Sequence, residues 1–414
     1  MLPIQSLKKV FAVVTLMMFS IVACRKELPQ AHDPENRYAS TFSDVFDNFW
    51  NTMNSRYQFW DRDTTDWDAM YTRYQPLFAK LDINNEDDQR KSVHYFKAML
   101  SGTLDGHMFL NFTPPAIYDS SVYPRVTQNE LTIQRVQIIN PLLLPGEAER
   151  ATNWYYFPYY DIDAANYLDT GSISGVYSDP DYGDVTVLGG TIRKNILYLG
   201  FDSEFLTLAI RDKGTNALKS AYTAFSQALQ NNPNVKGAIV DMRSSLGGFA
   251  NDAVLLASSM IDKPIMRGKV RYKNGTGRLD YTPWTPSYIN PATGAKAIKV
   301  PLIILTDVLT FSGAESVTAA LRAIHGAAIV GTATRGGITG NGAVNSIQGK
   351  GATTFQTLKL GNFMEMIMSS CSFRMPDGSE TIWGIKPDYV VPFDTTAILA
   401  GKDPQLEKAL LLIH

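Results

Sequence analysis

One serine of this 414-residue chain stands where a predicted strand passes into a predicted helix. Ser312 lies in TFSGAE, between the apolar run KVPLIILTD and the segment SVTAALRAIHG, whose apolar residues recur at helical spacing. A helix N-terminus offers free backbone N–H groups and a partial positive charge, which stabilise the oxyanion formed in acyl transfer. Ser312 is therefore a candidate nucleophile and Gly313 a candidate oxyanion donor, with a plain helix cap as the alternative reading of the serine.

A second turn, DMRSSLGG, follows another predicted strand. Its paired glycines, Gly247 and Gly248, let the backbone approach a substrate closely. Because neighbouring strand ends of a parallel sheet open on the same edge, we expect this turn to meet the serine. The N–H of Gly248, or that of Gly247, is the second predicted donor to an oxyanion.

A nucleophilic serine needs a base to take its proton, and the chain has five histidines. His325 lies 13 residues along the same predicted helix as the serine, which places it roughly 20 Å away, whereas a base must lie within about 3 Å. His32 falls in a polar N-terminal stretch, His414 is the last residue, and His94 is expected on a helix surface. His107, in LSGTLDGHMFL, is left as the candidate base.

These turns are positioned by a predicted α/β core over residues 191–395. Its strands are continuous apolar runs that alternate with helices, which indicates a largely parallel sheet covered by helices. The predicted strands are residues 195–201, 236–242, 299–306, 327–331, 354–360 and 364–370, and the predicted helices include 249–261 and 313–325. A C-terminal helix is expected within 396–414.

The region before the core divides into two parts. Residues 41–105 carry aromatic and aliphatic residues at helical spacing, which predicts a helical region with starts near Phe42, Asp66 and Asn85. Residues 106–190 predict an irregular β-rich region, in which a PDZ domain is not identified.

The N-terminus has the pattern of an export signal. Lys8 and Lys9 precede fourteen mostly apolar residues, a run too short for a membrane span, and Ile21-Val22-Ala23-Cys24 resembles a bacterial lipobox. We expect a signal peptide over residues 1–23, lipidation of Cys24 and a flexible tether over 24–40. The only other cysteine, Cys371, would then have no partner, so no disulfide framework is expected.

Composition excludes several classes of function. The net charge is -2, with 45% hydrophobic and 19% charged residues, as in a globular protein that does not bind nucleic acid. No His, Cys or Asp cluster has metal-ligand spacing, and no nucleotide-binding glycine motif follows a strand, so neither a metal nor a cofactor is expected. A G-x-S-x-G elbow is also absent.

Three segments in this order and spacing, VDMRSSLGG, ILTDVLTFSGAES and AAIVGTATRGG, resemble the core of the C-terminal processing (tail-specific) peptidases and the tricorn-type serine peptidases. LSGTLDGHMFL and PDGSETIWGIKPDYVVP are similar to the segments that precede and close this core. The resemblance covers roughly residues 40–110 and 191–394. It implies a crotonase-like (ClpP-like) ββα core and peptide hydrolysis through an acyl-enzyme, with Ser312 as nucleophile.

The two branches of this family use different bases. The processing branch carries a lysine about 25 residues after the serine, where this chain has Gly337. Arg335 cannot replace it, because a guanidinium stays protonated. The tricorn-type branch carries a catalytic histidine at the position of His107, so the chain resembles that branch more closely.

The resemblance also implies an acidic residue that orients the imidazole. Glu380 is the first candidate, and Asp105 and Glu315 stay open. Gly106 stands where tricorn-type sites have a serine. We therefore expect an exported, lipid-anchored serine peptidase of the bacterial cell envelope, acting on a peptide or protein, with its oligomeric state open. The alternative is a family member without activity that binds peptide or glycan.

Overall fold

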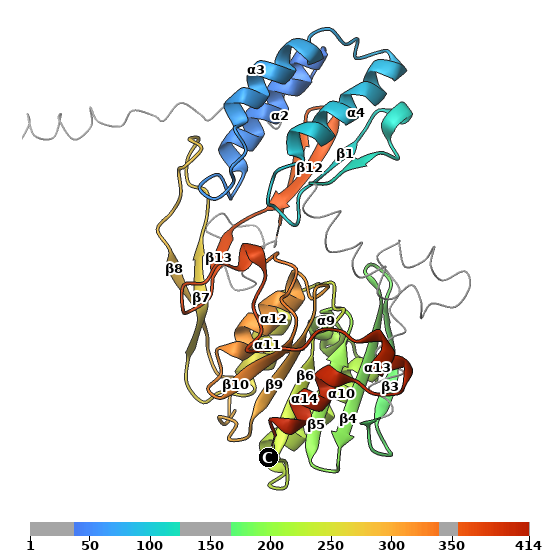
Figure 1. The fold of residues 1–414 in the computed structure, drawn as a ribbon, viewed down its shortest axis with the longest axis vertical. Coiled ribbons are helices and arrows are strands. Elements are labelled where there is room, and N and C mark those ends of the chain that lie inside the picture. The colour runs from blue at the N-terminus through green and yellow to red at the C-terminus, as the bar shows by residue number, and fades with distance from the viewer. Residues whose placement is uncertain (1–36, 125–166, 339–354, 414) are drawn as a thin grey trace, which may run out of the picture.

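The computed structural model describes residues 37–124, 167–338 and 355–413 (Figure 1). The expected signal peptide, Cys24, most of the tether and residues 125–166 lie outside the described residues. Among the residues that are described, no helix is both long and apolar enough to cross a membrane.

A seven-stranded sheet forms the core of the chain. Its strand order is β14-β10-β9-β6-β5-β4-β3, in which β5, β6, β9, β10 and β14 are parallel, β4 pairs antiparallel with β5, and β3 pairs antiparallel with β4. The strands are β3 (Ile173–Asp179), β4 (Gly183–Ile192), β5 (Ile196–Phe201), β6 (Gly237–Asp241), β9 (Leu302–Thr306), β10 (Ala327–Gly331) and β14 (Tyr389–Val390). The mixed α/β prediction is confirmed, but the sheet begins before residue 191, which falls inside β4.

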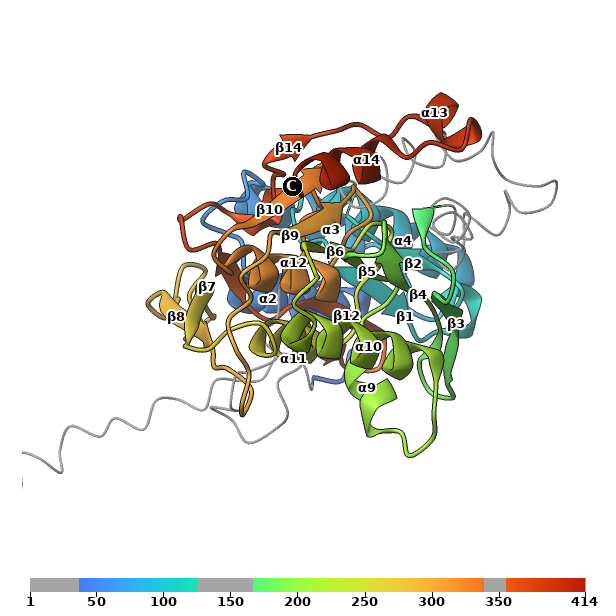
Figure 2. The same ribbon diagram turned by 90° about the horizontal axis from the view of Figure 1, so that it is seen from below.

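Helices cover both faces of this sheet (Figure 2). One face packs against α9 (Leu206–Arg211), α10 (Ala217–Asn231), α11 (Asn251–Ser258) and α12 (Gly313–Arg322), and the other against α14 (Pro404–Leu411). A short helix, α13 (Thr395–Leu399), precedes α14. Every residue of β5, β6 and β9 is buried, which is why these strands read as unbroken apolar runs.

A second hydrophobic core belongs to the N-terminal helical region. It contains α2 (Phe42–Arg56), α3 (Trp67–Phe78) and α4 (Glu86–Leu100), packed on a sheet of order β11-β12-β1-β2. These strands are β1 (Phe109–Phe112), β2 (Ser121–Val122), β11 (Phe355–Leu360) and β12 (Met364–Ser369). The sequence placed β11 and β12 in the α/β core, but β12 pairs with β1 and β11 pairs with β12. An apolar pattern predicts a strand but does not predict the partner of that strand.

A hairpin connects the two regions. Strands β7 (Ile265–Arg271) and β8 (Thr285–Ile289) form a third sheet with β13 (Ser372–Arg374), and the hairpin rises beside the N-terminal helices in Figure 1. Near its tip, Arg278 binds Asp68 of α3 at 2.7 Å and donates to the Asn54 side chain of α2 at 2.8 Å. The structure also contains two short 3-10 helices, Pro115–Ile117 and Thr381–Trp383.

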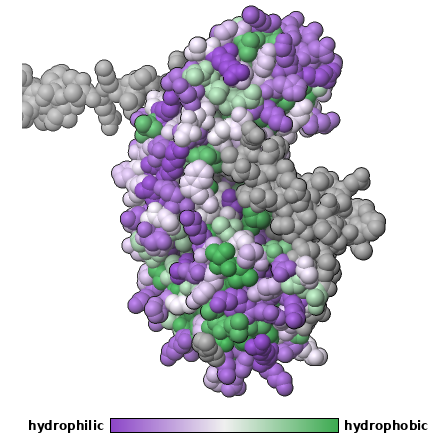
Figure 3. All heavy atoms as spheres, in the orientation of Figure 1, coloured by the Kyte–Doolittle hydropathy of each residue, from purple (hydrophilic) through white to green (hydrophobic). Residues whose placement is uncertain are grey.

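The surface is mixed in character. On the face drawn in Figure 3, hydrophilic side chains cover most of the helices of the N-terminal region, and hydrophobic ones are scattered among hydrophilic ones lower down. This pattern agrees with the near-neutral charge and ordinary composition of the chain.

Candidate active site

Ser312 lies on a strained turn between β9 and α12. Its backbone has φ 55° and ψ -111°, a conformation that side-chain-bearing residues rarely adopt. Such strain persists only where the surroundings hold it, and it clusters at functional sites. The N–H of Ser312 donates to the carboxylate of Glu315 at 3.1 Å, which fixes the first turn of α12 around the strained residue.

The structure brings His107 to this serine. His107 lies in the turn between α4 and β1, and its Nε2 is 2.8 Å from the Ser312 Oγ. Asp105 holds the turn: one carboxylate oxygen accepts the backbone N–H of His107 at 2.9 Å and the other accepts the N–H of Ser369 in β12 at 2.8 Å. The sheet of the N-terminal region therefore positions the His107 imidazole next to Ser312 of the α/β core.

The imidazole is kept neutral by its surroundings. Desolvation lowers the pKa of His107 to about 3, and the positive charge of Arg335 acts in the same direction. A neutral imidazole can accept the proton of a serine hydroxyl, whereas an imidazolium cannot. At neutral pH His107 is thus in the protonation state that a base requires.

The predicted oxyanion turn lies directly against the serine. A Cβ built on Gly247 would sit 2.7 Å from the Cβ of Ser312, and one built on Gly313 would sit 2.8 Å from the backbone nitrogen of Gly248. Gly247 and Gly248 also have φ values of 102° and 150°, which favour glycine. The N–H groups of Gly248 and Gly313 have no hydrogen bond within the described chain, so both can donate to a ligand.

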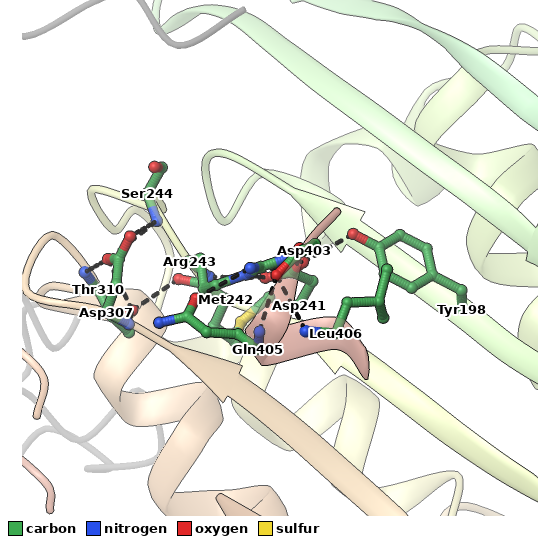
Figure 4. A network of polar contacts seen from close by, with 10 residues as sticks. All are labelled: Tyr198, Asp241, Met242, Arg243, Ser244, Asp307, Thr310, Asp403, Gln405 and Leu406. Atoms are coloured by element: carbon green, nitrogen blue, oxygen red, sulfur yellow. Dashed lines mark hydrogen bonds and ion pairs between the residues drawn. The ribbon is translucent and has the colours of Figure 1, made fainter. Parts of the chain in front are cut away.

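A buried ion network fixes the strand that leads into this turn (Figure 4). Arg243 binds Asp241 at 2.6 Å and Asp403, at the start of α14, at 2.8 Å. Tyr198 of β5 donates to Asp241 at 2.7 Å, and Arg243 donates to Gln405 at 2.9 Å. Because all these groups are buried, removal of one partner leaves an uncompensated charge, and the network ties the turn to the C-terminal helix.

The two turns of the site are also joined to each other. Asp307 accepts the N–H of Ser244 at 3.1 Å, and the Thr310 hydroxyl donates to the carbonyl of Met242 at 2.8 Å (Figure 4). Phe311 donates its N–H to the carbonyl of Ser245 at 3.0 Å. These bonds convert two separate strand ends into one rigid site.

Glu315, one of the acidic residues left open, does not orient His107. Its carboxylate accepts the Thr334 hydroxyl at 2.5 Å and the Gly336 N–H at 2.9 Å, besides the N–H of Ser312. Burial raises the pKa of Glu315 to about 7, although these hydrogen bonds favour the ionised form. Glu315 therefore joins the serine turn to the loop that follows β10.

Glu380 also has partners other than the imidazole. Its carboxylate binds Arg62 at 2.9 Å and forms a second ion pair with Arg374, so within the described residues its oxygens do not contact His107. A bridge between Arg374 and Glu380 fixes this arrangement next to β13. Glu380 does line the same small recess as Gly106, beside the site. The interpretation of Glu380 as the group that orients His107 is thus not supported by its contacts.

The position at which the processing branch has a lysine is filled by an aromatic ring. A Cβ built on Gly337 would lie 2.2 Å from Cε2 of Phe311. A lysine there would require Phe311 to move, so the steric environment agrees with the glycine found in the sequence. Sequence reasoning did not single out Phe311, because an aromatic residue beside a serine carries no distinctive pattern.

Neither a cluster of metal ligands nor an accessible thiol occurs among the described residues. No group of three or more His, Cys, Asp or Glu residues there could hold a metal ion. Cys371 is buried and forms no disulfide bond, and burial raises the pKa of its thiol to about 12. A thiol in this state is a poor nucleophile.

Comparison with known proteins shows which family the region around this site is similar to. Residues 208–391 match the family model described as Peptidase family S41. The matched range includes Ser312, both glycine turns and Glu380, but not His107. This match supports a peptidase, that is, a hydrolase, and agrees with the resemblance found in the sequence.

Solved structures agree on the fold. A protein described as a candidate peptidase, from Parabacteroides merdae ATCC 43184, has 22% identity and a TM-score of 0.63, with 91% of this chain and 98% of that chain covered. Mature CPAF has 12% identity and a TM-score of 0.54, with 90% of this chain and 97% of that chain covered. Both likenesses extend over the N-terminal region, so the arrangement of two cores belongs to the shared fold.

Proposed function

We propose that this chain is a serine-type peptidase in which Ser312 is the nucleophile and His107 the general base. The observation that carries the proposal is the 2.8 Å distance from His107 Nε2 to the hydroxyl of a serine with strained backbone at a helix N-terminus. Two unpaired amides beside that hydroxyl supply the remaining requirement of acyl transfer.

In the proposed reaction Ser312 Oγ attacks the carbonyl carbon of a peptide bond while its proton passes to His107 Nε2. The carbonyl oxygen becomes an oxyanion, which accepts hydrogen bonds from the N–H groups of Gly313 and Gly248. The C–N bond then breaks as His107 gives its proton to the leaving amine. Water, deprotonated by the same imidazole, hydrolyses the acyl-enzyme and restores the serine.

The histidine base favours the tricorn-type branch over the lysine-dependent one. Gly337 cannot act as a base, and Phe311 fills the volume that a lysine at this position would enter. The turns after the parallel strands β6, β9 and β10 contain glycines, and a crotonase-like (ClpP-like) core would place these turns at one edge of the sheet. Both assignments are part of the proposal.

A fluorophosphonate probe, which reacts with activated serines, tests the nucleophile. We expect the wild-type chain to be labelled at Ser312, as located by peptide mass spectrometry, and Ser312→Ala to be unlabelled. Ser178→Ala, which removes an exposed hydroxyl on β3, is the matched control and should be labelled as the wild type. If the wild-type chain remained unlabelled while a known serine peptidase reacted under the same conditions, the binding alternative would replace the enzyme.

We also propose that the protein is exported and anchored by a lipid on Cys24. The support is the charged and apolar pattern before Cys24 and the polar stretch after it. Expressed in a bacterium with a lipoprotein-processing system, Cys24→Ser should move the protein from the membrane fraction to the soluble fraction. Cys371→Ser is the control, and unchanged fractionation of Cys24→Ser would remove the anchor from the account.

A further inference from the structure

We propose that Phe311, the residue before the nucleophile, is the positioning residue that holds the His107 imidazole against Ser312. This inference rests on the proposed function and adds a role to it. The Phe311 ring stacks on the imidazole, with 4.6 Å between ring centroids and 23° between ring planes. Stacking fixes the plane of the imidazole, and the plane decides whether Nε2 points at the serine hydroxyl.

The Phe311 ring is itself held from several directions. The guanidinium carbon of Arg335 lies 4.6 Å from the ring centroid, a cation–π contact. The backbone of Arg335 is fixed as well, since its N–H donates to the carbonyl of Thr310 at 3.0 Å. The ring is only 8% exposed, so it has little freedom to rotate away.

Two glycines shape the space that the ring occupies. A Cβ on Gly337 would lie 2.2 Å from Phe311 Cε2, and a Cβ on Gly106 would lie 3.2 Å from the same atom. Gly106 directly precedes His107, so the absence of a side chain there lets the ring approach the imidazole. At Gly337 the Phe311 ring is the nearest obstacle to a side chain, whereas at Gly106 the Gly336 carbonyl oxygen, at 2.8 Å, is nearer still.

The three acidic residues considered from the sequence hold other groups. Asp105 holds the main chain of the His107 turn, Glu315 the serine turn, and Glu380 two arginines. The positive charge of Arg335, from the loop after β10, acts on the imidazole, whereas Asp105 accepts the backbone N–H of His107. Phe311 contacts the imidazole face directly and lies one residue from the nucleophile, so it couples the two reacting groups.

The test measures the second-order rate of fluorophosphonate labelling of the full chain as a function of pH. Phe311→Leu keeps an apolar side chain but removes the stacking face, and we expect the rate to fall about 10- to 100-fold, as for a misplaced catalytic group. We also expect the lower pH limit of labelling to move upward, because the looser imidazole gains solvent. Phe311→Tyr retains the ring and should recover most of the wild-type rate.

A double variant separates positioning from a general loss of structure. Gly337→Ala should slow labelling, because the added methyl group displaces the Phe311 ring. The double variant Phe311→Leu/Gly337→Ala should be labelled no more slowly than Phe311→Leu alone, because the ring that the methyl group would displace is no longer present. If Phe311→Leu does not fold, Gly337→Ala with a melting temperature near that of the wild type carries the same test.

The outcomes distinguish this role from the proposed function. Labelling of Phe311→Leu at the wild-type rate and with the wild-type pH limit would overturn the role of Phe311 alone. Additive losses in the double variant would also overturn it, since the ring would then not mediate the effect of Gly337→Ala. Absence of labelling in the wild type would overturn the proposed function and the positioning role together.

Discussion

The two hydrophobic cores of the molecule contribute differently to the candidate site. The core around the seven-stranded sheet supplies the nucleophile and both amide donors, all on turns that leave neighbouring strands. The N-terminal core supplies only His107, from the turn between α4 and β1, and lies outside the range that matches the peptidase family. The nucleophile and the amide donors are therefore positioned by one sheet alone. The position of the base depends on how the two cores pack against each other.

The largest effect is expected from removal of His107, the residue that the N-terminal core contributes to the site. His107→Ala removes the base, and we expect kcat/KM for a peptide substrate, or the labelling rate, to fall about 10⁴-fold or more. His94→Ala, an exposed position on α4, is the matched control and should retain the wild-type rate. A His107→Ala variant with near wild-type activity would mean that the N-terminal core contributes no base.

A smaller loss of activity is expected from a change in the oxyanion turn that follows β6. Gly248→Ala places a Cβ 2.7 Å from the carbonyl oxygen of Glu204, at a residue whose φ is 150°, so the turn must shift. Loss of one oxyanion donor typically lowers kcat about 10²- to 10³-fold. Gly294→Ala, at a glycine with no atom within 4 Å of the added Cβ, controls for backbone strain. Similar kcat values for both variants would contradict the oxyanion role.

The packing of the two cores is compared by a matched pair of substitutions. Phe96 and Phe225 are buried in the N-terminal core and the sheet core, respectively, and replacement by Ala should cost about 3–5 kcal/mol at either position. During denaturant unfolding, we expect Phe96→Ala to lose labelling before the circular dichroism of the sheet changes. In Phe225→Ala the two signals should be lost together. Coincident loss in both variants would indicate one cooperative unit.

The smallest expected effect concerns Glu380. Its half-buried ion pairs with Arg62 and Arg374 contribute to the contact between the regions. Glu380→Gln keeps the shape of the side chain and should change the labelling rate less than tenfold, because pairs of this kind contribute about 1 kcal/mol or less. A drop of 10³-fold or more would restore Glu380 as the residue that orients the imidazole.

Most of the sheet core could be predicted from the sequence because its strands are buried on both faces. The prediction of 327–331 matches β10, and 236–242 differs from β6 by one residue at each end. Two locations could not be predicted. Strands β11 and β12 join the N-terminal core, and β3 and β4 join the main sheet, since alternating patterns do not specify a partner strand.

The site divides in the same way. Ser312, Gly313 and the paired glycines are predictable because a strand, a turn and a helix start are all local signals. His107 was reached by exclusion of the other histidines, and its 2.8 Å contact with Ser312 depends on packing between residues 205 positions apart. Glu380 was assigned by resemblance alone. Its partners are Arg62, in the turn after α2, and Arg374 of β13. No local sequence pattern predicts that these residues lie together.

The central claim is that a neutral His107 acts as the base for Ser312. The pH dependence of labelling tests it most directly, because the labelling rate of Ser312 depends on the protonation state of its base. With a His107 pKa of about 3, the imidazole stays neutral well below 6.5, so the rate should remain near its neutral value at pH 5. The same shift makes the folded state lose stability as pH falls from about 6.5 toward 3, because the unfolded chain binds the proton first. Labelling should therefore be measured at pH values where circular dichroism shows a folded chain. A rate that halves near pH 6.5 in folded protein, or that does not depend on His107, would contradict the account.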